Sequence, residues 1–197
     1  MQINQKQNIR FIKIWTLSEV YHPEETSTGY FMTKITESLS SNFTTSVICA
    51  RPNYDGKGAK VRKKEIHNGV RIFRVYSTIF NKNNIFLRVI NMISFCMSSL
   101  IFGIQHIKKN DLIFVVTNPP FLPIVAMLVA KIKGAEFILK IDDVYPDILE
   151  ISSKFKKESR FFSLYRFFNK IVYKRAKSII VLGRDMKKLL IKKEKSI

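Results

Sequence analysis

Acidic residues are scarce in this sequence. The 197-residue chain has 34 Lys and Arg but only 15 Asp and Glu, which gives a formal net charge of +19. Such an excess indicates an anionic partner: nucleic acid, an anionic membrane surface or a phosphorylated substrate. The charge is uneven, because the segment 154–195 holds 15 basic and 3 acidic residues.

Cysteine, glycine and proline are also few. Two cysteines, Cys49 and Cys96, cannot build a disulfide framework, and no Cys-x-x-Cys pair suggests zinc or redox chemistry. Both lie among apolar residues, so we expect buried, unreactive thiols and no metal site. Seven Gly and six Pro exclude collagen-like and low-complexity chains, and 46% hydrophobic residues exclude a disordered one. The N-terminal 15 residues lack an apolar run long enough for a signal peptide, which predicts a cytoplasmic protein.

Short apolar runs alternate with segments of helical periodicity. Strands are expected at 11–18, 44–50, 70–77, 111–120, 136–142 and 178–183, and helices at 30–41, 85–104, 124–133, 160–177 and from 184 onward. Continuous apolar strands separated by helices indicate a parallel sheet covered on both faces. The predicted fold is therefore a doubly wound, mainly parallel α/β domain spanning residues 1–197.

In such sheets ligands bind in the crevice at the carboxyl ends of the strands. The segments that follow predicted strands are 19–29, 51–58, 117–120, 142–150 and 183–185. Four of the fifteen acids fall within one of these segments, at Asp142, Asp143, Asp147 and Glu150. This position favours a binding site over a solvated acidic turn in which Asp147 only caps the next helix.

Five segments resemble the family 4 glycosyltransferases in order and spacing. They are EVYHPEETSTGYFMTKITESLS (19–40), ICARPNY (48–54), VVTNPPFLP (115–123), DDVYPDILE (142–150) and IIVLGRDM (179–186). More narrowly, the chain is similar to the bacterial branch that builds polysaccharide repeat units of the colanic-acid or O-antigen type. The resemblance runs from about Phe11 to Leu190. It implies the GT-B architecture, in which two Rossmann-like domains face each other across a cleft, and metal-independent transfer of a sugar from a nucleotide-sugar donor with retention of configuration.

The family's C-terminal domain binds most of the donor through an E-x7-E motif and basic residues. This chain ends at Ile197, about where the first domain would lead into the second. The expectation is therefore the N-terminal, acceptor-side domain alone, with the donor-binding domain absent. The alternative is a non-catalytic fragment, or one subunit of a split transferase whose donor-binding partner is a separate chain.

The loop before the first helix is a candidate phosphate site. Ser27 or Thr28 is expected to cap this helix, and Gly29 allows close approach of the backbone to a ligand. With a single glycine, a plain capping turn explains these residues equally well. In the family this loop approaches the donor diphosphate, and Gly29 falls at the matching position.

The acidic segment supplies the candidate catalytic residues. Their position at a strand end places Asp143 and Asp142 at the cleft, where carboxylates would accept hydrogen bonds from sugar or acceptor hydroxyls, with Tyr145 beside them. Relatives often carry His where this chain has Asp142, which leaves an acid/base role at that position open.

Other strand-end residues have simpler alternatives. Asn118 precedes a rigid Pro-Pro turn that either shapes the acceptor pocket or only ends the strand. Arg184 either contacts donor phosphates or forms a salt-bridged helix cap with Asp185. His22 in the first loop either points into the cleft or has a structural role, and nothing in the sequence around His67 indicates a function.

Two predicted helices are candidates for contact with a membrane. The segment 85–104 has one charge, Arg88, and is long enough to span a bilayer. However, Arg88, Asn91, Ser94 and Ser98 fall on one face, and a crossing would separate strands that must share a sheet. We expect this helix to be buried against the sheet, with an exposed apolar edge at most.

The segment 160–178 reads as an interfacial helix. Phe161, Leu164, Phe168 and Val172 line one face, and the basic residues Arg166, Lys170, Lys174 and Lys177 line the opposite one. The apolar face can pack in the core while the basic face contacts lipid phosphates. A lipid-linked sugar acceptor would account for this, and it predicts a protein peripherally attached to the inner face of the plasma membrane. Nucleic acid is the rival partner, but no helix-turn-helix, zinc-finger or RNA-recognition motif is present.

Overall fold

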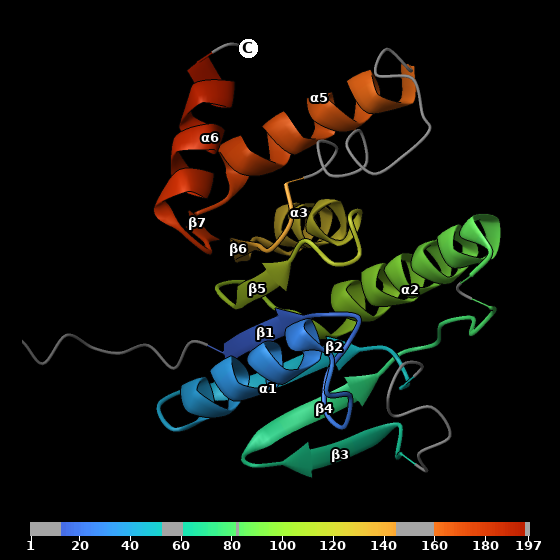
Figure 1. Cartoon of the computed structure of the whole chain (residues 1–197). Coiled ribbons are helices and arrows are strands. Elements are labelled where there is room, and N and C mark those ends of the chain that lie inside the picture. Colours follow the sequence, from blue (N-terminus) through green and yellow to red (C-terminus); the bar gives the residue numbers. More distant parts are fainter. Residues whose placement is uncertain (1–12, 53–60, 82, 145–159, 196–197) are drawn as a thin grey trace, which may run out of the picture.

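The protein is described by a computed structural model that covers residues 13–52, 61–81, 83–144 and 160–195. Its strands form a seven-stranded sheet in the order β3-β4-β2-β1-β5-β6-β7 (Figure 1). The strands are β1 Lys13–Leu17, β2 Thr44–Cys49, β3 Lys64–His67, β4 Val70–Arg74, β5 Leu112–Val116, β6 Glu136–Ile141 and β7 Ser178–Val181. Strand β3 is antiparallel to β4, and the other pairs are parallel. The predicted doubly wound α/β fold is confirmed.

The edge strand β3 was missing from the sequence prediction. Its residues KEIH alternate between exposed and half-buried positions, so they carry no apolar run. The signal that could have found it is the Asn68–Gly69 pair, which joins β3 to β4 with φ values of 46° and 79°. Asn-Gly is the preferred pair for a two-residue hairpin turn, since both positions need positive φ.

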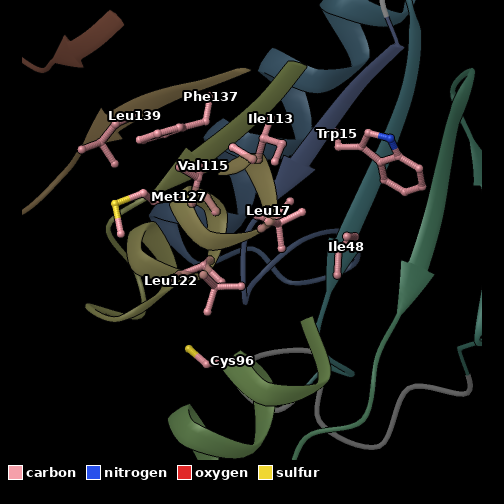
Figure 2. Close-up of a cluster of buried hydrophobic side chains, with 14 of the residues drawn as sticks. Trp15, Leu17, Ile48, Cys96, Ile113, Val115, Leu122, Met127, Phe137 and Leu139 are labelled. Atoms are coloured by element: carbon pink, nitrogen blue, oxygen red, sulfur yellow. The ribbon is translucent and has the colours of Figure 1, made fainter. Parts of the chain in front are cut away.

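Helices cover the two faces of the sheet unequally. They are α1 Ser27–Ser40, α2 Ile85–His106, α3 Leu122–Lys133, α5 Arg160–Arg175 and α6 Arg184–Lys195. One face packs on α1 through a core that includes Met32, Val47 and Ile72. The other face packs on α2, α3 and α5 through a larger core around Trp15, Leu17, Phe95, Val115 and Leu139. Figure 2 shows Leu122 and Met127 of α3 and Cys96 of α2 on this second face.

The two cysteines are buried, as predicted. Burial raises the pKa of Cys49 and of Cys96 to about 12, so both thiols stay protonated at neutral pH. Because the thiolate is the nucleophile, neither cysteine has the properties of a catalytic residue.

Helix α2 departs from its predicted orientation. Its buried residues are Asn91, Phe95, Cys96, Ser99 and Gly103. Of its thirteen large apolar side chains six are exposed, six are half-buried and only Phe95 is buried. The polar residues Asn91 and Ser94 face the protein, where they bind the segment 78–80. The expected burial of this helix against the sheet therefore holds for one side only.

Candidate functional site at the carboxyl edge of the sheet

Strands β1, β5 and β6 lie side by side and end at the same edge of the sheet. The loops that follow them therefore meet there: 18–26 after β1, 117–121 after β5 and 142–144 after β6. Strand β1 leads through α1 to β2 on one side and borders β5 on the other. Such a reversal of strand order opens the crevice in which open α/β sheets bind ligands.

Thr117 holds the acidic segment in place at this edge. Its hydroxyl oxygen accepts hydrogen bonds from the backbone N–H of Asp142 at 3.1 Å and of Asp143 at 3.3 Å. The hydroxyl is buried, so the start of the acidic segment is tied to the neighbouring strand β5. Sequence reasoning did not single out Thr117, although a hydroxyl residue immediately after a buried apolar strand was the available signal.

The two aspartates differ in their surroundings. Asp142 forms an ion pair with Lys140 of β6, and the other carboxylate oxygen of Asp142 is buried without a hydrogen-bond partner. Asp143 is half-buried, and no described residue forms an ion pair with it. Asp143 is therefore the better placed of the two to accept a hydrogen bond from a ligand, while Asp142 is held by the protein. Lys140 was also missed, although a lysine inside the apolar run EFILKI marks an unusual buried charge.

The N-cap of α1 is Thr26, so the predicted caps Ser27 and Thr28 are wrong. Thr26 has extended backbone angles, and its hydroxyl accepts a hydrogen bond from the N–H of Gly29 at 3.2 Å. Ser27 and Thr28 lie inside the first turn, where their N–H groups have no intrahelical acceptor. Those two groups remain suitable for an anion, whereas the N–H of Gly29 is already used by the cap.

Gly29 is required by close packing in this loop. A Cβ atom at this position would lie 2.6 Å from the carbonyl oxygen of Glu24, a contact that side chains do not tolerate. The loop therefore turns tightly over the start of α1, next to the end of β1. A larger residue at position 29 would displace it.

His22 does not stand free in the crevice. Its ring stacks on that of His67 of β3, with 3.7 Å between ring centres, and its carbonyl oxygen accepts a hydrogen bond of 2.8 Å from Arg74. The Arg74 side chain is fully buried and forms an ion pair with Glu65 at 2.7 Å. Burial lowers the pKa of His22, and the adjacent His67 ring lowers it further. These contacts fix the loop after β1 to the β3–β4 hairpin, and they give both histidines structural partners.

The remaining strand-end candidates lie at the same edge or outside the described residues. Asn118 is half-buried directly after β5, and Arg184 is exposed after β7, at the start of α6. No ion pair joins Arg184 to Asp185. Tyr145 lies outside the described residues, as do Asp147 and Glu150. Among the described residues, no group of three or more His, Cys, Asp or Glu is placed to hold a metal ion.

Helix α5 is tied to the site by Tyr165. Its hydroxyl donates a hydrogen bond of 2.9 Å to the carbonyl oxygen of Pro120, and its ring packs edge-on against Phe121. Tyr165 and Val172 are buried, whereas Leu164 is 55% exposed, so the predicted inward position of Leu164 is wrong. The basic residues Arg166 and Lys174 are exposed, Lys170 is half-buried, and Lys177 lies beyond the helix in an ion pair with Glu136.

Comparisons with known proteins agree with this architecture. No family model matches the chain. It is 25% identical over 184 residues to "Probable glycosyltransferase WbjE" of Pseudomonas aeruginosa, an alignment that covers 92% of this chain and 44% of that protein. A sucrose-phosphate synthase from Thermosynechococcus elongatus has a similar structure, with a TM-score of 0.65 and 10% identity over 92% of this chain and 45% of that one. A second structure of that enzyme gives a TM-score of 0.56 with 10% identity, over 89% and 78% of the two chains.

The chain thus spans less than half the length of the curated relative that it matches. It is homologous to a probable glycosyltransferase, and it has the Rossmann-like fold of a GT-B glycosyltransferase domain.

Proposed function

We propose that the chain is the acceptor-side domain of a retaining, family 4-type glycosyltransferase that builds a surface polysaccharide. The observation that carries this proposal is the pair Asp142–Asp143, fixed by Thr117 at the carboxyl edge of the sheet. The similarity to a probable glycosyltransferase over 92% of the chain supports it.

The site residues would have separate roles in transfer. Asp143 would accept a hydrogen bond from a hydroxyl of the sugar or the acceptor, and Asp142, paired with Lys140, would keep the segment in position. The free N–H groups of Ser27 and Thr28 at the start of α1 would bind donor phosphate, and Arg184 would add positive charge. As the bond from the anomeric carbon to the diphosphate breaks and the bond to the acceptor oxygen forms, these groups would stabilise the departing diphosphate. The proton of the acceptor hydroxyl passes to the departing diphosphate, which gains negative charge as its bond to the sugar breaks.

The acceptor in this proposal is a lipid-linked sugar. The exposed basic residues of α5, Arg166 and Lys174 together with Lys170, would contact anionic headgroups at the inner face of the plasma membrane. Tyr165 places this helix directly beside the β5 loop. A membrane-bound acceptor would then reach the crevice without leaving the bilayer surface.

A donor-binding lobe on a separate chain is the second candidate arrangement. Strand β7 and the residue after it expose Ile179, Ile180 and Leu182, an apolar edge that such a lobe would cover. In that case the chain described here would bind the acceptor and the membrane, and transfer would require the partner.

The test uses labelled UDP-, GDP- and dTDP-sugars with lipid extract from the source organism in detergent micelles. We expect label to enter the organic phase with the wild-type chain, or with the chain plus its donor-binding partner. We also expect the immobilised chain to retain lipid-linked saccharide. Asp143→Asn should lower both signals, and Asp185→Asn, at an exposed aspartate on α6, should leave them unchanged. Absence of both transfer and retention would refute the proposal.

A further inference from the structure

Helix α2 turns Asn91, Ser94 and Ser99 inward, whereas Arg88 and Gln105 are exposed. The side-chain oxygen of Asn91 accepts hydrogen bonds from the Thr78 hydroxyl at 2.7 Å and the Phe80 N–H at 3.0 Å, and its amide donates to the Phe80 carbonyl at 3.0 Å. The Ser94 hydroxyl accepts from the Thr78 N–H at 2.9 Å. These bonds fasten the segment 78–80 to the inner side of the helix, and they use the polar groups that would otherwise face water.

The outer side of α2 is apolar along most of its length. The α2 apolar stripe consists of Ile85, Val89, Ile93, Met97 and Ile101, which recur every four residues and are between 38% and 65% exposed. Phe86 on the helix and Ile79 and Phe80 before it extend the exposed apolar surface. A water-facing helix has the opposite arrangement, with polar residues outward. A stripe of this size marks an interaction surface.

The position of α2 in the fold requires it to lie along a surface instead of crossing it. By length and composition, α2 is the one helix in the described part of the chain that could span a bilayer. Its two ends lead to β4 and β5, which belong to the same sheet (Figure 1). Its inner side packs on α3, where Gly103 lies so close to Val129 that an added Cβ would be 3.0 Å from a methyl group.

The charge of the helices beside α2 indicates which kind of partner covers the α2 apolar stripe. Helix α3 lies between α2 and α5, and the three together contain eight Lys and Arg and no Asp or Glu. Each also exposes large apolar side chains, Leu128 and Ile132 on α3 and Leu164 and Phe167 on α5. An apolar stripe next to basic residues, with no carboxylate on any of the three helices, complements an anionic lipid surface.

We propose that the α2 apolar stripe inserts into the headgroup region of an anionic bilayer, with the axis of α2 parallel to the membrane plane. The proposal extends the membrane attachment proposed above, but it stands on a different helix. Under it, α2 supplies the apolar insertion and α5 supplies electrostatic attraction.

Vesicle co-sedimentation of the 197-residue chain tests this directly, since it involves no sugar transfer. The vesicles contain phosphatidylcholine with about 30% phosphatidylglycerol, and pure phosphatidylcholine vesicles show how much the anionic lipid contributes. The stripe variant Ile93→Gln/Met97→Gln should lower the partition coefficient about tenfold, because two inserted side chains lose their apolar contacts. The matched control Phe31→Gln/Ile66→Gln changes two exposed apolar residues on α1 and β3 and should bind like wild type.

A spin label at position 93 distinguishes insertion of the α2 apolar stripe into the bilayer from binding of the protein at the bilayer surface. Because Cys49 and Cys96 are buried, an Ile93→Cys variant offers one accessible thiol for labelling. On anionic vesicles the label should become more accessible to oxygen and less accessible to a water-soluble nickel complex.

Three outcomes would overturn the inference, each in a different way. Wild-type binding that Arg166→Ser/Lys174→Ser abolishes and the stripe variant leaves intact would leave attachment to α5 alone. A dimer in sedimentation velocity that the stripe variant dissociates would make a second copy the occupant. Failure of the wild-type chain to bind anionic vesicles would refute both membrane proposals, while the transfer assay would still decide the proposed function.

Discussion

The carboxyl edge of the sheet and the outer face of its α2–α3–α5 layer differ in charge and polarity. The loops at the edge carry Glu19, Glu24, Glu25, Asp142 and Asp143, whereas the three helices of the layer carry no acid at all. Polar groups at the edge are held by the protein, as Thr117 and Lys140 show. The layer exposes apolar side chains and the basic residues between them. The net charge of +19 is therefore unevenly distributed over the molecule, and the two surfaces suit different partners.

The largest expected effect is at the acidic edge. Asp143→Asn removes the carboxylate that would accept a hydrogen bond from substrate, and we expect sugar transfer to fall about 100-fold. Binding to anionic vesicles should not change, because Asp143 lies outside the helix layer. Glu25→Gln, which neutralises an exposed acid at the same edge, is the control. Equal losses in the two variants would mean that the edge acts only through its overall charge.

The second largest effect is expected on stability, from loss of the ion pair between Lys140 and Asp142. Lys140→Met leaves the largely buried Asp142 carboxylate without its cation, and we expect the free energy of unfolding to fall by about 2 kcal/mol. Urea denaturation followed by circular dichroism measures this change. Adding Asp142→Asn to Lys140→Met should recover part of the loss, because the uncompensated charge is then gone. If it recovers nothing, the pair does not act through its charge.

The orientation of α2 can be tested by comparing a substitution on its buried side with one on its exposed side. Asn91→Leu makes α2 more apolar, yet we expect it to cost about 1.5 kcal/mol, because it removes three hydrogen bonds to Thr78 and Phe80. Ile101→Gln makes the helix more polar and should change stability by less than about 0.5 kcal/mol, because this residue is exposed. Thermal unfolding of both variants decides the orientation of the helix, and the reverse ranking would show that α2 faces the other way.

The smallest expected effect is a pH dependence at the edge. The lowered pKa of His22 means that the unfolded chain binds more protons than the folded one just below pH 6.5, so stability should fall as the pH drops through this range. The charged neighbours are His67, Glu65, Arg74 and Glu37. His67→Gln removes the stacked ring that adds to the shift, and the loss of Tm between about pH 8 and about pH 5 should be smaller in this variant. An unchanged pH dependence would assign it to other groups.

Much of the fold could be predicted because parallel strands buried on both faces are continuous apolar runs. The edge strand β3 lacks such a run, so only its Asn68–Gly69 turn marked it. The edge location of Asp142 and Asp143 followed from the same rule, but their support by Thr117 and Lys140 depends on which strands become neighbours. The cap of α1 was misplaced because Thr26, Ser27 and Thr28 are all capping residues.

The orientation of α2 could not be predicted for a related reason. Helices α2 and α3 are both strongly apolar, yet α3 buries seven of its twelve residues and α2 five of its twenty-two. Helix α3 lies between two other helices, whereas α2 packs on α3 and leaves its outer flank open. Apolar composition predicts a helix, and the arrangement of its neighbours decides what covers it.

The most direct test of two separate surfaces is a crossed measurement on Asp143→Asn and Ile93→Gln/Met97→Gln. Each variant is assayed for sugar transfer to acceptor in detergent micelles and for binding to anionic vesicles, with circular dichroism as the check on folding. We expect Asp143→Asn to lose transfer and keep vesicle binding, and the stripe variant to keep transfer and lose vesicle binding. A folded variant that loses both activities, or an Asp143→Asn chain that transfers sugar as well as wild type, would contradict this account.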